Sequence, residues 1–117
     1  MKQPILWCAI LTLLAGCATG APTAESKDRA DCRAYSRPLE HSGRMKDACM
    51  ISRGYAVIYN TVAGWVEVRS KAQPRQSPEV IATDLKGCND SIGAGYVGRL
   101  EFAKCMDPRG YLVTGKD

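Results

Sequence analysis

The stretch Cys49-Met50-Ile51-Ser52-Arg53-Gly54-Tyr55 decides the fold predicted for this chain, because most of it occurs twice. The second copy, 56 positions later, is Cys105-Met106-Asp107-Pro108-Arg109-Gly110-Tyr111. Cys32 recurs at the same offset as Cys88, so each copy has the pattern C-x16-C-M-x-x-R-G-Y, and Asp28 likewise recurs as Asp84. A single repeat of this length indicates two related units inside one domain rather than a solenoid.

The ending C-M-x-x-R-G-Y is typical of the end of a helix. Glycine adopts the left-handed conformation at the C′ position without the strain that a Cβ brings, and Gly54 is placed for that role. Counting back puts Met50 at C3 and Tyr55 at C″, two positions that touch in a Schellman motif. Arg53 adds positive charge where the helix dipole is negative. We therefore predict helix C-caps at Met50, Gly54 and Tyr55, and at Met106, Gly110 and Tyr111.

Further signals place the remaining helices. Pro108 lacks an amide hydrogen and restricts Asp107, so the second capped helix is expected to end early or kink. The helix before it has a clear start at 77–79, where Ser-Pro-Glu combines an N-cap, a proline at N1 and an acidic first turn. Its apolar face consists of Ile81, Leu85, Cys88 and Ile92, and a weaker face in the first copy consists of Met45, Ala48, Cys49 and Ser52. The spacing predicts two helical hairpins.

The segment between the two hairpins has a different composition. Residues 56–62 and 65–69 are rich in β-branched and aromatic side chains around Ala63-Gly64, which favours a short β-hairpin. Ala-Gly is not one of the strong two-residue turns, so a helix is the alternative. Residues 71–78 are expected to form a loop. The predicted fold class is mainly α, with two disulfide-closed helical hairpins from a tandem duplication and a short β-hairpin between them.

The cysteines of the repeat are expected to form disulfides. Equal spacing makes Cys32 with Cys49 and Cys88 with Cys105 the natural pairs, although four cysteines allow two other connectivities. Each bridge would stabilise the domain by about 3 kcal/mol by restricting the unfolded chain. A zinc site is the disfavoured alternative, because zinc cysteines usually come as close C-x2-4-C pairs. A redox-active C-x-x-C pair is absent, and we expect no metal and no cofactor.

The amino terminus has the order of a secretory signal peptide. Lys2 precedes an apolar run over 4–14, about half the ~20 residues that a membrane span needs, and small residues then lead to Cys17. The sequence Leu14-Ala15-Gly16-Cys17 resembles the signal of bacterial lipoproteins at every position. The resemblance implies cleavage after residue 16 and lipid on Cys17, whereas an ordinary secretory signal is the alternative. Several acyl chains would anchor the protein firmly, since one alone binds only marginally.

The same resemblance suggests where the protein resides. In diderm bacteria a residue other than Asp after the lipidated cysteine usually permits transfer to the outer membrane, and Ala18 fits that route. The C-M-x-x-R-G-Y endings are similar to those of short lipoproteins of proteobacteria, which implies residence in the envelope and carries no activity. We expect an outer-membrane anchor with the domain in the periplasm.

The proposed signal and tether leave room for one small domain. Residues 1–16 form the signal and 17–27 a lipidated, flexible tether of small and polar residues. Residues 28–117 then form a single domain of two repeats, 28–57 and 84–113. Loss of Lys2 leaves 15 basic against 12 acidic residues, and the basic residues do not form a run. This scattered excess does not indicate nucleic-acid binding.

No pattern in the sequence indicates catalysis. His41, the only histidine, lies in a polar loop over 36–44 without a partner motif, and a solvated side chain is the simpler interpretation. Residues 93–98 spell G-x-G-x-x-G, but they follow a helix pattern and lack a βαβ unit, so we interpret them as loop. We therefore expect no enzyme, with an unrecognised site as the alternative.

The leading functional hypothesis is an accessory or assembly factor of a larger envelope complex. It would be held to the membrane through Cys17 and contact an envelope protein that the sequence does not identify. The alternative is a disulfide-framed binding module, such as an inhibitor of a secreted hydrolase, which presents the loops 36–44 and 91–99. The two hypotheses differ in whether the lipid anchor is needed.

Overall fold

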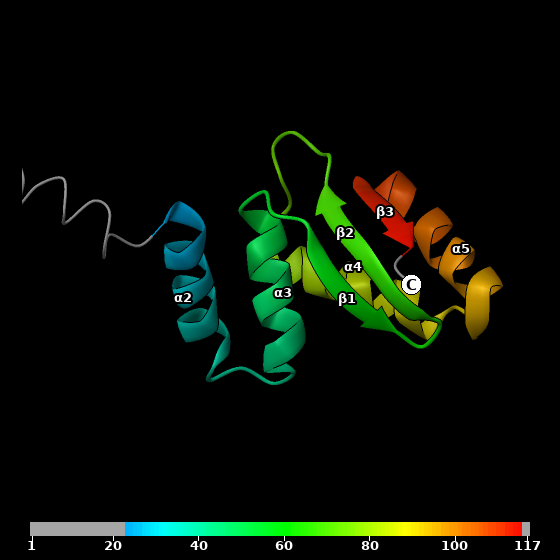
Figure 1. Ribbon diagram of the computed structural model, residues 1–117, viewed down its shortest axis with the longest axis horizontal. Coiled ribbons are helices and arrows are strands. Elements are labelled where there is room, and N and C mark those ends of the chain that lie inside the picture. Colours follow the sequence, from blue (N-terminus) through cyan, green and yellow to red (C-terminus); the bar gives the residue numbers. More distant parts are fainter. Residues whose placement is uncertain (1–22, 116–117) are drawn as a thin grey trace, which may run out of the picture.

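The computed structural model describes residues 23–115, which form four α-helices and one three-stranded antiparallel sheet (Figure 1). The predicted signal, Cys17 and residues 18–22 lie outside this range. The helices are α2 (Ala24–Ser36), α3 (Ser42–Ser52), α4 (Pro78–Asp90) and α5 (Gly95–Met106). The strands are β1 (Val57–Thr61), β2 (Gly64–Ser70) and β3 (Tyr111–Gly115), and a 3-10 turn η1 (Asp107–Arg109) follows α5.

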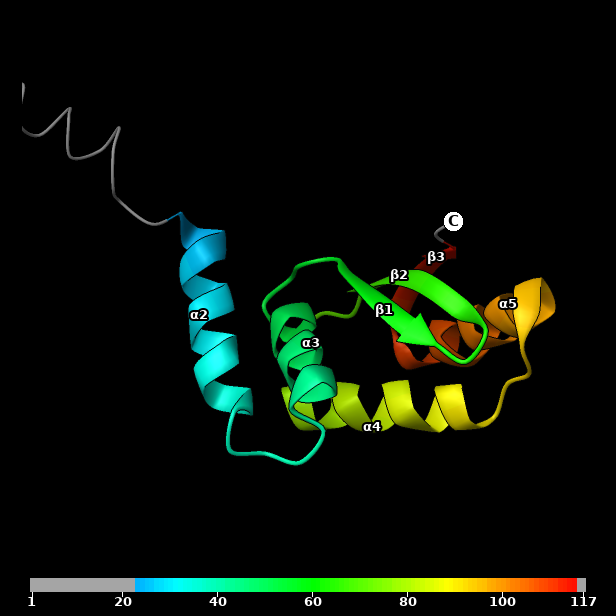
Figure 2. The same ribbon diagram turned by 60° about the horizontal axis from the view of Figure 1, so that its bottom comes forward.

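Each helical hairpin is followed by a strand, and the strands meet in one sheet. The order in the sheet is β1-β2-β3, with β2 in the centre, so the strands after the two hairpins lie at its edges. Figures 1 and 2 show α2 at one end of the molecule, outside α3, while α4 runs beneath the sheet and α5 lies beside β3. The first helix is therefore peripheral, and the other three surround the core.

The main core lies between one face of the sheet and helices α3, α4 and α5. Val66 and Val68 alternate along β2 with the exposed Trp65 and Arg69, as expected for a sheet with one solvated face. The buried residues that fill this core are Ala48, Ile51, Tyr59, Val66, Val68, Ile81, Ala82, Leu85, Cys88, Phe102, Met106 and Tyr111. The sheet is thus an integral layer of the domain.

The structure keeps the mainly helical character of the predicted fold and adds to the sheet a third strand that the sequence did not reveal. Strand β3 follows the second helix stop directly and pairs with β2, for example Val113 with Val68. The predicted β-hairpin is present, and the helical alternative for this segment is wrong. Its turn is Val62-Ala63 rather than Ala63-Gly64, since Thr61 pairs with Gly64. The Thr61 hydroxyl accepts the Ala63 amide at 3.1 Å, which stabilises the tight connection.

Two expected segments are more ordered than the composition indicates. The prediction of a flexible tether over 17–27 is wrong from Thr23 on, because its hydroxyl accepts the Ser26 amide at 3.0 Å and caps α2, which begins at Ala24. The folded part therefore starts before residue 28. The predicted loops are also shorter, since α3 begins at Ser42 and α5 at Gly95. Residues 71–77 contain neither helix nor strand, as expected.

Candidate functional site

Both helical hairpins are closed by a disulfide. Cys32 of α2 is bonded to Cys49 of α3 with a Cα–Cα distance of 5.5 Å, and Cys88 of α4 to Cys105 of α5 at 5.7 Å. These are the two pairs that the spacing predicts. Within the part of the chain that the structure describes, no group of three or more His, Cys, Asp or Glu residues is placed to hold a metal ion.

The first copy of the repeat ends α3 with both hydrogen bonds of a Schellman motif. The Tyr55 amide donates to the Met50 carbonyl at 3.2 Å, and the Gly54 amide donates to the Ile51 carbonyl at 3.0 Å. Gly54 has φ +97°, the left-handed conformation that glycine tolerates. The Tyr55 ring packs against the small cluster of Cys32, Cys49 and Met50, so the cap also carries the predicted apolar contact.

The second copy reaches the same left-handed glycine by a different path. Helix α5 ends at Met106, and Pro108 lies in the 3-10 turn that follows, so the helix ends early as its position predicts. Gly110 again has φ +97°, and its amide donates to the Asp107 carbonyl at 3.1 Å. Tyr111 then enters β3 and is completely buried. Two different helix ends thus deliver a tyrosine to equivalent places.

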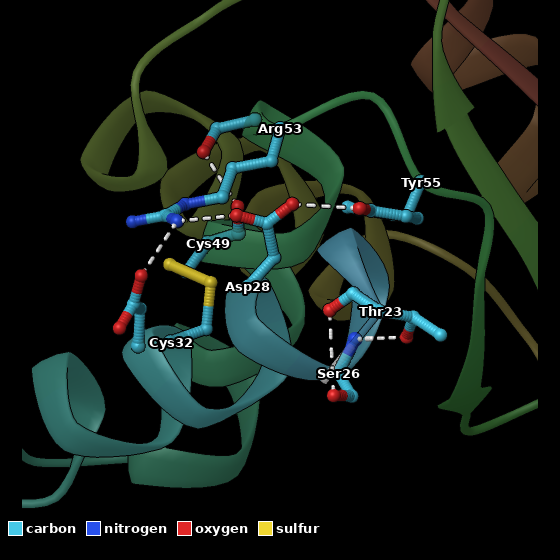
Figure 3. A network of polar contacts seen from close by, with 9 residues as sticks. Thr23, Ser26, Asp28, Cys32, Cys49, Arg53 and Tyr55 are labelled. Carbon is cyan, nitrogen blue, oxygen red and sulfur yellow. Dashed lines mark hydrogen bonds and ion pairs between the residues drawn. A yellow bond between two sulfur atoms is a disulfide. The ribbon is translucent and has the colours of Figure 1, made fainter. Parts of the chain in front are cut away.

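A polar cluster beside the first disulfide locks α2 to the end of α3 (Figure 3). The Tyr55 hydroxyl donates to Asp28 Oδ2 at 2.6 Å, and Arg53 Nη1 binds Asp28 Oδ1 at 2.6 Å. Hydrogen bonds from Tyr55 and then Arg53 hold the pKa of Asp28 below its usual range. The same carboxylate raises the pKa of Tyr55. Because Asp28 lies one helical turn before Cys32, the polar cluster and the disulfide together attach this part of α2 to the end of α3.

The second hairpin contains the same cluster in a drier setting. The Tyr111 hydroxyl donates to Asp84 Oδ2 at 2.7 Å, and Arg109 Nη1 lies 3.3 Å from Asp84 Oδ1. The Asp84 side chain is 13% exposed, against 26% for Asp28 in the first hairpin. Burial, followed by the hydrogen bond to Asp84, raises the pKa of Tyr111 far above its ordinary value. The recurrence of Asp28 as Asp84 at the repeat offset is the signal in the sequence that points to this shared role.

The first hairpin also has an open, charged face. Side chains of α2 and α3 line a series of shallow hollows there, which we call the basic groove, and its cations are Arg29, Arg33, Arg37 and Lys46. Glu25 forms an ion pair with Arg29 at 3.1 Å. Asp47 lies at the sheet side of the groove, where burial raises its pKa to about 6.

A second distinctive surface lies where the β1–β2 turn meets the start of α5. We call it the apolar tip, and its exposed side chains are Val62, Tyr96, Val97 and Leu100, with exposed fractions of 60%, 68%, 66% and 45%. Arg99 joins the turn to the helix by donating to the Ala63 carbonyl at 3.2 Å. Its guanidinium also lies 5.9 Å from the centre of the Tyr96 ring. Large exposed apolar side chains gathered on neighbouring elements are typical of a contact surface.

The G-x-G-x-x-G sequence has a packing role at this tip. Gly98 is buried, and a Cβ on it would lie 1.8 Å from the Gly93 carbonyl oxygen and 2.8 Å from the Ala63 Cβ. Only glycine fits at position 98, because α5, the loop before it and the β1–β2 turn come so close together there. His41 is exposed in the loop before α3, with φ +54°, and makes no side-chain hydrogen bond that caps the helix.

No protein-family model, curated protein or solved structure matches the chain. None of the helices within residues 23–115 has the length and apolar character that a membrane span requires.

Proposed function

We propose that the protein is a lipid-anchored, non-enzymatic accessory or assembly factor of the bacterial cell envelope. The observation that carries this proposal is the lipoprotein-like sequence Leu14-Ala15-Gly16-Cys17, which ends six residues before the cap of α2 at Thr23. The two disulfides support it, because such bonds persist in oxidising compartments such as the periplasm. In this proposal the anchor lies on the outer membrane and the domain in the periplasm.

The apolar tip is the part of the surface best suited to contact an envelope protein. It belongs to the end of the molecule away from α2, and therefore away from the proposed anchor (Figures 1 and 2). At the positions equivalent to Tyr96, Val97 and Leu100, the first hairpin has Glu40, His41 and Arg44. An apolar surface on one hairpin alone favours a specific contact over a general property of the fold. The shortened loops make presentation of long inhibitory loops the weaker alternative.

We also propose that the two hairpins arose by tandem duplication. In both, the same offset relates the disulfide, the left-handed glycine and the Asp-Arg-Tyr cluster. Each hairpin is also followed by an edge strand of the sheet. The second hairpin then supplies six of the twelve buried core residues and the first only two, while the first lies between the core and the proposed anchor.

Two experiments test the proposed function. Metabolic labelling with a radioactive fatty acid should label the wild-type chain and not the Cys17→Ser variant. A photo-crosslinking amino acid at Tyr96 should yield a discrete crosslinked envelope protein, whereas the same group at Glu40 should not. Absence of lipid on Cys17 would overturn the anchor. Equal crosslinking at both positions, or none at either in a lipidated chain, would overturn the contact at the apolar tip.

A further inference from the structure

The basic groove occupies positions that form the core in the second hairpin. Arg29 and Lys46 correspond at the repeat offset to Leu85 and Phe102, which are completely buried beneath the sheet. The first hairpin instead packs on α4 through Ala48 and Ile51, and its Arg29 and Lys46 line a hollow whose sheet side is formed by Val57 and Ile58 of β1. The face that would be apolar core is therefore charged, with Arg29 exposed and Lys46 partly exposed.

The charge that remains on this face is mainly positive. Arg29, Arg33 and Arg37 are spaced by four residues, so they follow one stripe of α2, and Lys46 of α3 lines the same hollows. Glu25 neutralises part of the charge on Arg29, but within residues 23–115 neither Arg33 nor Arg37 forms an ion pair. The stripe is thus available to an anionic partner.

Two of the three acidic side chains of α2 are bound away from the groove, whereas Glu25 pairs with Arg29 inside it. Asp28 and Asp31 both pair with Arg53 at the end of α3, at 2.6 and 3.3 Å. Beside the Glu25–Arg29 pair, this leaves Arg33 and Arg37 as unpaired cations on the basic side, within the residues that the structure describes. A segregation of this kind favours a flat or extended anionic partner over a small ion, since the cations extend along more than two turns of helix.

We propose that the basic groove docks the first hairpin onto anionic phospholipid headgroups of the membrane that holds the anchor. The proposal rests on the proposed lipid attachment at Cys17. Five residues lie between Cys17 and Thr23, so the chain between these two residues reaches at most about 20 Å. Thr23 lines the same hollow as Arg29 and Arg33, so the chain leaves the domain on the basic side. A short tether from this side brings the stripe to the headgroups, and the cations complement their phosphates.

Docking of the first hairpin would orient the whole domain. The apolar tip belongs to the far end of the molecule, beyond the sheet (Figure 1). With α2 held against the headgroups, that tip faces away from the membrane toward envelope proteins. The groove thereby gives the anchor a second attachment point, which limits rotation about the tether.

The test uses the chain from residue 17 on with Cys17→Ser, so that its result does not depend on lipidation. Flotation measures binding to phosphatidylcholine vesicles with and without about one-third phosphatidylglycerol. We expect binding to the anionic vesicles alone, and its loss when salt is raised from about 0.1 to 0.5 M, because the three arginines of the groove are exposed. Arg29→Gln/Arg33→Gln/Arg37→Gln/Lys46→Gln should weaken binding by at least about 100-fold.

A matched variant removes four cations elsewhere. Lys27→Gln/Arg69→Gln/Lys86→Gln/Lys104→Gln changes net charge equally at exposed positions outside the groove, and should weaken binding by less than about tenfold. Circular dichroism checks that both variants remain folded. Equal losses in the two variants, or no binding of the parent chain, would overturn docking. Retained binding by the groove variant would overturn it as well. Fatty-acid labelling of Cys17 tests the anchor separately, so failure of one proposal is distinguishable from failure of the other.

Discussion

Replacement of Gly98 by alanine should destabilise the domain, although alanine is the better helix former. A Cβ at this position would lie 1.8 Å from the Gly93 carbonyl oxygen, 2.7 Å from its carbonyl carbon and 2.8 Å from the Ala63 Cβ. The first two atoms belong to the backbone, so no side-chain rotation relieves the overlap, and α5 must move away from the loop and the turn. Overpacking of this kind costs up to about 3 kcal/mol. The higher helix propensity of alanine returns about 1 kcal/mol, which leaves a net loss of about 2 kcal/mol.

Gly87 provides the matched control. It lies inside α4, is exposed, and a Cβ there would meet nothing within 4 Å, so Gly87→Ala should stabilise the domain by about 0.5–1 kcal/mol. Urea unfolding of both disulfide-intact variants, followed by circular dichroism, measures the difference. Gly98→Ala should lower the midpoint by about 1–2 M and Gly87→Ala should raise it. A Gly98→Ala variant as stable as the wild type would show that helix, loop and turn do not meet as closely as described.

Four other variants test the disulfide-closed hairpins and the groove. Tyr111→Phe should lower the free energy of unfolding by about 2 kcal/mol in urea titrations, because the buried hydroxyl binds a carboxylate. Tyr55→Phe should lower the free energy of unfolding by less, because its partner Asp28 is more exposed than Asp84. A larger loss for Tyr55→Phe than for Tyr111→Phe would contradict this explanation. Cys32→Ser/Cys49→Ser should increase amide hydrogen exchange in α2 more than in the other helices, because Cys32 is the only buried apolar residue of α2. An equal increase in all four helices would contradict the peripheral position of α2. Because burial raises the folded-state pKa of Asp47 to about 6, its contribution to stability should fall as pH rises from 4 to 6, so over this range the wild type should lose on the order of 1 kcal/mol relative to Asp47→Asn.

Features encoded by near neighbours in the chain could be predicted from the sequence. The left-handed Gly54 and the hydrogen bond from Tyr55 to Met50 follow from one heptapeptide, and the start of α4 follows from Ser77 and Pro78. In each case the side chain or glycine acts on backbone groups within one or two turns, so the pattern and its cause coincide. Equal cysteine spacing extended this success to pairs 17 positions apart.

Features that depend on distant partners were missed. Strand β3 has only five residues, and its conformation depends on pairing with β2. The paired residues are far apart in the sequence, since Val113 pairs with Val68, 45 positions earlier. The roles of Asp28 and Asp84 were likewise hidden, because each carboxylate meets its tyrosine 27 positions away. Gly98 was interpreted as loop, since the turn that requires a glycine there comes from another part of the chain.

The two hairpins show how one local design can support two different tasks. Disulfide, glycine stop and Asp-Arg-Tyr cluster fix the angle and spacing of two helices without help from a large apolar core. The residues on the faces of the hairpin are then free to differ, which is why Leu85 is core where Arg29 is solvent-exposed. A hairpin that depended on its apolar face for stability could not exchange that face for a row of arginines. The fastening is therefore what allows one copy to build the domain and leaves the other available to meet a charged surface.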